Sequence, residues 1–317
     1  MTDPRIDAHD ELSLIALIAE RIGPPAATTV LGPGDDAAVI DLGGRPAVLT
    51  IDAAVEGVHF RTDWCSAVDV GTRIAAASLS DVNAMGATCH GLVASLVLPG
   101  ETPLSWLLGL IDGLRDEAAK AGAQLVGGDL AAGPTVVVTT AALGSPARRR
   151  TVDRSGAQPG QVVAVAGRLG WAAAGFSVLS RGFRTPLALV GAFRRPAVDY
   201  RWGPRAAREG ATSLIDVSDG LLLDASRIAT ASGVALAFER TRLTPDEPLT
   251  AVASAMNVDP LLWVLGGGDD HALLGTFPET AGLPVGFRAV GRVLAEPVGA
   301  VLLDGTAADP VGYRHYA

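Results

Sequence analysis

Aspartates follow short apolar or glycine-rich runs along much of this 317-residue chain. The first two, Asp35 and Asp36, are adjacent in the stretch "VLGPGDDAAVI". The pattern returns at Asp52, Asp81, Asp129, Asp216, Asp219, Asp269 and Asp270. Carboxylates that come close together repel one another and raise each other's pKa unless a cation relieves the repulsion. Because Mg²⁺ binds carboxylate, water and phosphate oxygens, the pattern indicates phosphate chemistry supported by divalent metal ions.

A single aspartate after a strand is more often a turn residue or a helix N-cap than a ligand. Ser218 or Asp219, just before "GLLLDASRIA", is a candidate cap of this kind. Seven or more such acids are harder to explain as separate turns, since side chains at strand ends can converge on one face. We therefore expect several of them to form one cluster.

Three familiar phosphate-binding patterns are excluded by the residues. The segment "GPGDDA" fits a dinucleotide-binding fingerprint, but Gly43-Gly44 turns the chain before a helix can form there. A P-loop needs a lysine after its glycines, and the only lysine is Lys120 in "DEAAKAGA". The protein-kinase signatures, a strand lysine and H-R-D, are also missing.

The charge balance, the cysteines and the absence of long apolar runs exclude several binding partners and cellular locations. The chain has 34 acidic and 25 basic residues and a net charge of −9, which argues against nucleic-acid binding. Its two cysteines, Cys65 and Cys89, have no metal or redox spacing, which is typical of a reducing compartment. The first residues lack a signal-peptide pattern and no apolar run is long enough to span a membrane. We expect a cytoplasmic protein with no membrane association.

The elements that must position the acids alternate between helices and strands. Residues 1–25 predict an amphipathic helix with a stripe of Leu12, Ile15, Ile18, Ala19 and Ile22. A hairpin is expected around Gly43-Gly44, followed by further helices and strands. The Pro- and Arg-rich stretch "SPARRRTVDRSGAQPGQ" interrupts this periodicity. We predict two domains, 1–148 and 149–317.

Seven motifs occur in a fixed order: "GPGDDAAVI", "TIDAAVEGVHF", "SLSDVNAMGA", "VGGDLAAGP", "VDRSGAQPG", "IDVSDGLLLD" and "GGGDDHALL". In order and spacing the set resembles thiamine-monophosphate kinase, in the superfamily of aminoimidazole ribonucleotide synthetase and selenophosphate synthetase. The resemblance implies a two-domain fold with an α/β N-terminal domain, containing a mixed sheet and helices, and an α+β C-terminal domain. It also implies a homodimer formed by joining N-terminal strands.

The activity implied is transfer of the γ-phosphoryl group of ATP to thiamine monophosphate, with several Mg²⁺ ions around the phosphates. Positions resembling metal ligands are Asp36, Thr50, Ile51 through its backbone carbonyl, Asp52, Asp81, Asp129, Asp216 and Asp219, with Asp35 a possible addition. Positions resembling nucleotide contacts are Gly128, Asp129, Arg154 and Ser218. Positions resembling acceptor contacts are His59, Asp269 and Tyr313. No catalytic side chain beyond these metal-holding groups is implied.

Two departures from the family pattern leave alternatives open. Ile51 stands where a hydroxyl residue is usual, and "GGDDHA" at 267–272 replaces the usual G-G-E-D-Y-E. Because these changes fall near the implied acceptor pocket, a related kinase or ligase with another acceptor is the alternative function. From a different class, a metal-dependent phosphohydrolase or a catalytically silent nucleotide-binding protein would also suit the number of carboxylates.

Overall fold

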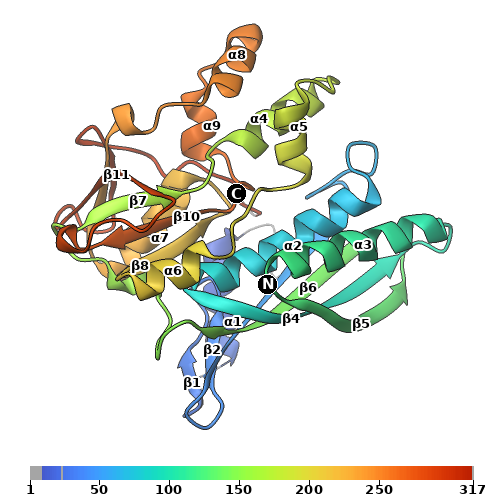
Figure 1. The fold of residues 1–317 in the computed structure, drawn as a ribbon, viewed down its shortest axis with the longest axis horizontal. Coiled ribbons are helices and arrows are strands. Elements are labelled where there is room, and N and C mark those ends of the chain that lie inside the picture. Colours follow the sequence, from blue (N-terminus) through green and yellow to red (C-terminus); the bar gives the residue numbers. More distant parts are fainter. Residues whose placement is uncertain (1–8, 23, 316–317) are drawn as a thin grey trace, which may run out of the picture.

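A computed structural model of the chain describes residues 9–22 and 24–315, and contains two separate β-sheets with their helices. The first sheet uses strands between residues 29 and 146, and the second uses strands between residues 162 and 307. Figure 1 shows the two sheets in separate parts of the molecule, with helix α2 lying along the first sheet and one of its ends reaching the second, so the middle of the molecule is a junction between two layered units.

The first unit contains a six-stranded mixed sheet in the order β1-β2-β3-β6-β4-β5. Its elements are α1 (Glu11–Ile22), β1 (Thr29–Leu31), β2 (Ala38–Asp41), β3 (Pro46–Val55), α2 (Ala67–Ala84), β4 (Ala87–Leu98), α3 (Leu104–Lys120), β5 (Gln124–Ala132) and β6 (Val137–Pro146). All the neighbouring strands are antiparallel except β4 and β5, which are parallel.

Helices α2 and α3 cover one face of this sheet, and they pack unusually close together. A Cβ atom on Gly71 of α2 would lie 2.2 Å from the Leu110 carbonyl oxygen, and one on Gly113 of α3 would lie 2.3 Å from the Val68 carbonyl oxygen. Both positions therefore need glycine. The opposite face, which we call the outer sheet face, exposes Leu49, Ile51, Val93, Val126 and Leu143.

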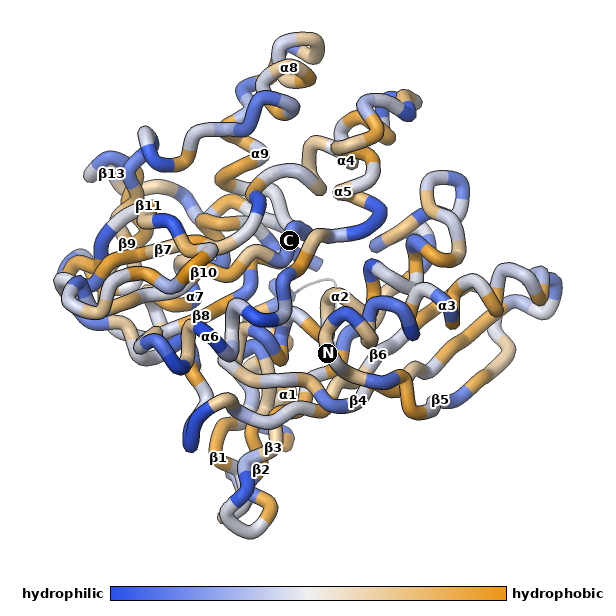
Figure 2. Tube along the Cα trace, viewed as in Figure 1, coloured by the Kyte–Doolittle hydropathy of each residue, from blue (hydrophilic) through white to orange (hydrophobic). Residues whose placement is uncertain are grey.

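The second unit contains a seven-stranded sheet in the order β13-β12-β9-β11-β7-β10-β8. Its strands are β7 (Val162–Ala166), β8 (Ser213–Val217), β9 (Ala235–Phe238), β10 (Ala272–Phe277), β11 (Phe287–Leu294), β12 (Val301–Leu303) and β13 (Thr306–Ala307). Its helices are η2 (Arg154–Gly156), α4 (Trp171–Ser180), α5 (Leu187–Arg194), α6 (Trp202–Arg208), α7 (Leu221–Ser232), η3 (Arg240–Arg242), α8 (Glu247–Met256), α9 (Leu261–Gly266) and η4 (Glu279–Ala281). In Figure 2 the strands of this sheet are mainly orange, in keeping with their burial.

Helices α4, α5, α8 and α9 form a lobe beside the second sheet (Figure 1). The lobe is tied to the sheet by Asp270, which is buried and precedes β10. Its two carboxylate oxygens accept hydrogen bonds from the backbone N–H groups of Trp171 and Ala172, each at 2.9 Å. Asp270 therefore caps the first turn of α4 from almost a hundred residues away.

The fold class expected from the sequence is confirmed, as is the hairpin at Gly43-Gly44 between β2 and β3. Of the helix expected over residues 1–25, the structure has α1 at Glu11–Ile22, and residues 1–8 and 23 lie outside the described residues. None of the residues of α1 is buried, so its apolar stripe is open to solvent. The prediction that Ser218 or Asp219 caps α7 is wrong. The N-cap is Gly220, and Asp224 instead accepts the N–H groups of Asp219 and Gly220.

The division into domains 1–148 and 149–317 stays a prediction, although each sheet lies on one side of that boundary. Within the described ranges, no helix combines the length and the apolar character required to cross a membrane.

The capping carboxylate predicts a pH-dependent stability. Burial raises the pKa of Asp270 to about 7 from a usual value of 3.8. Because the pKa of Asp270 is higher in the folded state than in the unfolded chain, folding favours the protonated form of this side chain. Its contribution to the free energy of unfolding is therefore complete below about pH 4 and is lost as the pH rises through about 7. The Asp270→Asn variant keeps a capping oxygen and removes this titration. We expect the free energy of unfolding, measured with urea, to fall less between pH 5 and pH 8 in Asp270→Asn than in the wild type. An equal fall in both proteins would contradict the assignment of this titration to Asp270.

Candidate functional site

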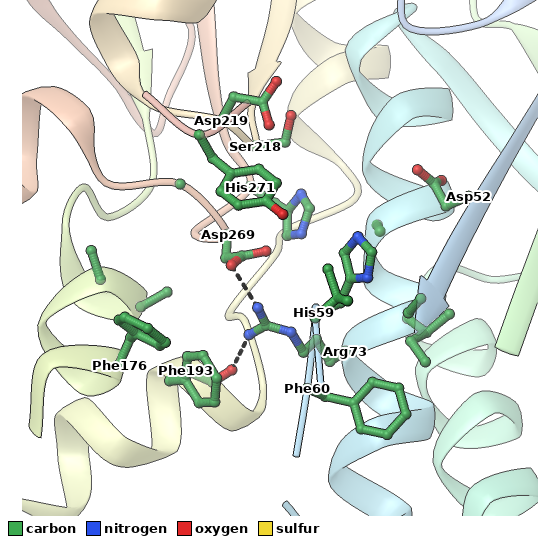
Figure 3. Close-up of a pocket in the computed structure, with 18 of the residues that line it drawn as sticks. Asp52, His59, Phe60, Arg73, Phe176, Phe193, Ser218, Asp219, Asp269 and His271 are labelled. Carbon is green, nitrogen blue, oxygen red and sulfur yellow. Dashed lines mark hydrogen bonds and ion pairs between the residues drawn. The ribbon is translucent and has the colours of Figure 1, made fainter. Parts of the chain in front are cut away.

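A cavity of about 710 Å³ opens at the junction of the two units. Side chains from α2 and β3 of the first unit line it, together with side chains from α4 and the loops after β8 and α9 of the second unit. Figure 3 shows Asp52 on one side of the cavity and Phe176 with Phe193 on the other. One end of the cavity is therefore acidic and the other is aromatic.

Three carboxylates from separate elements meet beside the acidic end, where Asp81 and Asp216 line the cavity and Asp36 lies against them. Asp36 lies in the loop between β1 and β2, Asp81 lies in the last turns of α2, and Asp216 belongs to β8. One oxygen from each lies within 4.8 Å of the others. We call these residues the acid cluster. It joins the first unit to the second, because Asp216 comes from the other sheet.

Neighbouring polar groups orient the cluster. The Thr50 hydroxyl donates to Asp81 at 2.6 Å, and His271 Nδ1 lies 2.9 Å from the carboxylate of Asp216. Asp52 lies close by on β3 and accepts a hydrogen bond from the Ser78 hydroxyl at 2.8 Å. These contacts fix the direction of each carboxylate before any ligand arrives.

Burial together with the close approach of like charges sets the pKa values here. Burial raises the pKa of Asp36 and of Asp81 well above the usual value, and the neighbouring acids raise both further. The pKa of Asp52 is also raised, mainly by burial. For Asp216, burial opposes ionisation, but the hydrogen bond and charge of His271 outweigh it and lower the pKa. The raised pKa values of Asp36 and Asp81 indicate that the surrounding residues do not supply enough positive charge to neutralise the three carboxylates.

Arg154, at the start of η2, supplies part of that charge. Its Nη2 lies 2.5 Å from Asp36 Oδ1, and its backbone N–H donates to Asp35 at 2.9 Å. The second oxygen of Asp36 is buried and has no hydrogen-bond partner among the described residues. An orphaned carboxylate oxygen beside two further acids fits a hard divalent cation with oxygen ligands.

Ser218 and Asp219 follow β8 and also line the cavity. The Asp219 carboxylate lies 2.5 Å from Arg227, whose guanidinium also contacts the buried Asp224. Burial raises the pKa of Asp219 despite this pairing. Asp219 is thus near the acid cluster without being a member of it.

The predicted acceptor contacts His59, Asp269 and Tyr313 also line the cavity. Asp269 lies 2.5 Å from Nη2 of Arg73 on α2, and the same guanidinium donates to the carbonyl oxygen of Phe193 (Figure 3). His59 Nδ1 accepts the N–H of Val55 at 3.1 Å. The Tyr313 N–H donates to the Asp219 carbonyl oxygen at 2.9 Å, which holds the C-terminal segment against the cavity.

Gly128, Asp129 and the side chain of Ile51 are not brought into this cavity. Ile51 is 69% exposed on the outer sheet face. Gly128 and Asp129 lie exposed on β5, the far edge of the sheet, with β6 and β4 between them and β3. At the usual strand spacing of about 4.8 Å this separation is roughly 14 Å, beyond the reach of one aspartate side chain.

The expectation that the acids lie at strand ends is correct for Asp216 but wrong for others. Asp52 is inside β3, Asp81 is inside a helix, and Asp129 is inside β5. Sequence analysis also missed Arg73, because an arginine on an amphipathic helix is normally solvated. One signal was present. Arg73, Ala77 and Asp81 are spaced i, i+4, i+8, and all three line the cavity.

Comparison with known proteins agrees with this arrangement. The family described as "AIR synthase related protein, N-terminal domain" matches residues 34–145. The chain is 43% identical over 303 residues to a thiamine-monophosphate kinase of Mycobacterium tuberculosis, covering 95% of this chain and 90% of the relative. It is 33% identical over 300 residues to that of Corynebacterium glutamicum, covering 92% and 88%.

The solved structure "AaThiL complexed with AMPPCP and TMP" superposes with a TM-score of 0.91 at 27% identity, covering 100% of both chains. Similarity to the two curated relatives extends along nearly the whole chain. The chain belongs to the thiamine-monophosphate kinase family.

Proposed function

We propose that this chain transfers the γ-phosphoryl group of ATP to thiamine monophosphate, giving thiamine diphosphate and ADP. The observation that carries the proposal is the acid cluster at one end of a cavity whose other end is aromatic, in a chain of this family. An oxygen of the acceptor phosphate attacks the γ-phosphorus, and the bond from that phosphorus to the ADP oxygen breaks. The enzyme contributes mainly alignment and charge neutralisation.

The residues divide this work between the two ends of the cavity. We assign Ser218 and Arg154 to the nucleotide, because both lie beside the acid cluster and Arg154 carries a positive charge. His59, Asp269 and Tyr313 are assigned to the acceptor, because all three line the same cavity and match acceptor-contacting positions of the family pattern. This division brings the two phosphates together between the two sets of residues.

Magnesium belongs to the proposal as well. Asp36, Asp81 and Asp216 would hold it, with Thr50, Asp52 and Asp219 close by. Bound there, it would neutralise the charge of the two phosphate groups that must approach each other. The orphaned oxygen of Asp36 supports this assignment.

A homodimer is the third part of the proposal. The outer sheet face exposes five large apolar side chains, which is unusual for a monomer. Strand β2 pairs with β3 only at residues 46–49. Among the described residues, no strand pairs with the same edge of β3 at residues 50–54, and none pairs with the outer edge of β5. Pairing of β5 from each chain with β3 of the other would close both edges in a two-fold arrangement and bury the apolar faces together.

This dimer gives Gly128 and Asp129 a role. With β5 of the partner beside the free edge of β3, the partner's Asp129 would lie next to the segment that carries Thr50, Ile51 and Asp52. Asp129 then joins the metal and nucleotide site of the other subunit, and the backbone carbonyl of Ile51 is near enough to contribute. The exposure of Asp129 in a single chain supports this reading.

A cytoplasmic location completes the proposal. It is supported by the two buried cysteines, Cys65 and Cys89, neither of which forms a disulfide.

Removing one carboxylate of the acid cluster should separate folding from function. Asp81→Asn relieves repulsion, so we expect its melting temperature without ligand to equal or exceed that of the wild type. The stabilisation by Mg²⁺ with ATP should disappear, and kcat/KM for thiamine diphosphate formation should fall by roughly a hundredfold or more. Asp112→Asn, on the exposed side of α3, is the matched control. Wild-type turnover in Asp81→Asn would contradict the proposal.

The dimer can be tested on the outer sheet face. Val93→Glu puts a charge in the middle of that face, where burial of an unpaired carboxylate would be strongly unfavourable. We expect sedimentation to show a dimer for the wild type and a monomer with little activity for Val93→Glu. Leu187→Glu changes a side chain that is equally apolar and even more exposed, but on α5, and should remain dimeric. A monomeric, active wild type would overturn the proposed assembly.

Mixing two inactive variants tests whether Asp129 acts across the dimer. In the proposed dimer each active site uses Asp81 of one chain and Asp129 of the other, so Asp81→Asn and Asp129→Asn remove carboxylates that different chains supply. After subunit exchange, half of the dimers are mixed and each mixed dimer has one intact site, so about a quarter of wild-type activity should return. If Asp129 served its own chain, every site would keep one defect, and no activity would return.

A further inference from the structure

Three aromatic side chains form a wall at the end of the cavity opposite the acid cluster. Trp64 precedes α2, Phe176 lies in α4 and Phe193 lies in α5. The Trp64 ring centroid lies 5.8 Å from that of Phe176 and 6.0 Å from that of Phe193, and the two phenyl rings are 5.9 Å apart. We call these residues the aromatic wall. Both units contribute to it, so it exists only when the junction is formed.

Two members of the aromatic wall already have a cation on the ring. The Arg61 guanidinium lies 4.6 Å from the Trp64 ring centroid, and the Arg73 guanidinium lies 4.4 Å from that of Phe193. In the described part of the chain, no arginine or lysine covers Phe176 in this way. Phe176 is therefore the one member of the aromatic wall that could still receive a positive group.

Phe176 is also the member that the fold leaves open. Its side chain is 50% exposed and lines the cavity, whereas Phe193 is only 4% exposed. Its contacts with Trp64 and Phe193 are at interplanar angles of 70° and 43°, so neither neighbour stacks flat against it. An exposed phenyl ring is unfavourable in water, and here a ligand in the cavity could cover it.

The charges around Phe176 select the kind of ligand. Asp269, with half of its side chain exposed, lines the same cavity and lies on the Phe193 side of it, next to Arg73. Arg73 balances Asp269 but is itself held by Asp269 and by the Phe193 carbonyl, so it cannot turn toward Phe176 without breaking both contacts. A flat, positively charged ring would gain from the negative face of the phenyl group and from the exposed part of the Asp269 carboxylate.

We propose that Phe176 is a specificity-determining residue that stacks against the positively charged ring of the acceptor. The inference rests on the proposed function, since thiamine monophosphate carries a cationic thiazolium ring joined to its phosphate arm. The ring lies on Phe176, supported from behind by Trp64 and Phe193, while the phosphate extends along the cavity to the acid cluster. Selection of the acceptor therefore depends on the ring as well as on the phosphate.

Steady-state kinetics of Phe176→Ala and Phe176→Leu test the inference. We expect KM for thiamine monophosphate to rise about tenfold in Phe176→Ala, with kcat and KM for ATP within about twofold of the wild type. Phe176→Leu keeps an apolar side chain without the π face and should still show most of the increase. Phe176→Trp should restore a KM close to that of the wild type, which a loss of packing alone would not predict.

The matched control is Phe183→Ala, which removes a phenyl ring that is 59% exposed, follows α4 and lies outside the cavity lining. It should leave both KM values unchanged. If KM for thiamine monophosphate in Phe176→Ala equals that in Phe183→Ala while the wild type is active, the inference is overturned and the proposed function stands. If the wild type forms no thiamine diphosphate, the proposed function fails and the inference fails with it.

Replacing the acceptor with an uncharged analogue tests whether the charge of its ring, as well as the shape of the ring, is recognised at Phe176. An analogue of thiamine monophosphate in which an uncharged ring replaces the thiazolium should bind the wild type more weakly, and should lose little further affinity in Phe176→Leu. An equal loss for the charged and the neutral acceptor in Phe176→Leu would overturn the assignment of a cationic ring to this position.

Discussion

Repulsion among buried carboxylates is the constraint on which the rest of this structure depends. Asp36, Asp81 and Asp216 come from a loop, a helix and a strand of two different sheets, and they meet within 4.8 Å. Such a group is unfavourable unless positive charge is present. Arg154 and His271 provide part of that charge within the chain, and both contact the cluster directly. The negative charge that Arg154 and His271 leave uncompensated favours a divalent cation at this junction, and with it a phosphate-bearing ligand.

The same junction also organises the recognition of ligands. Arg73 reaches from α2 to Asp269 and to the Phe193 carbonyl oxygen, so one side chain connects the first unit with two segments of the second. Asp270, next to Asp269, caps α4, the helix that carries Phe176. The loop at 267–271 therefore positions a carboxylate and an aromatic ring together. The shorter acid at position 269 is accommodated here by its contact with Arg73.

Much of this arrangement could be predicted from the sequence, and the failures have physical causes. The motifs around Asp36, Asp81 and Asp216 indicated a cluster, and the structure brings those three together. The face on which a residue lies is decided by long-range pairing, so the exposure of Asp129 on β5 could not be read locally. The sequence marks His271 only as a departure from the family pattern, although in the structure its ring is the direct partner of Asp216. Arg73 and Phe176 were missed because a helical arginine and a helical phenylalanine usually have no role beyond solvation and packing.

Helix α2 gives the site a fixed length. Arg73 and Asp81 lie on one face of it, eight residues apart, which corresponds to about 12 Å along the helix axis. In the proposed complex, Arg73 lies at the end of the cavity that receives the ring and Asp81 lies at the end that receives the phosphate. A helix packed through two glycine contacts cannot stretch between them. The helix therefore fixes the distance between the two ends of the cavity. A molecule with the right ring and the right anion, but with a longer or shorter chain joining them, would reach only one end at a time.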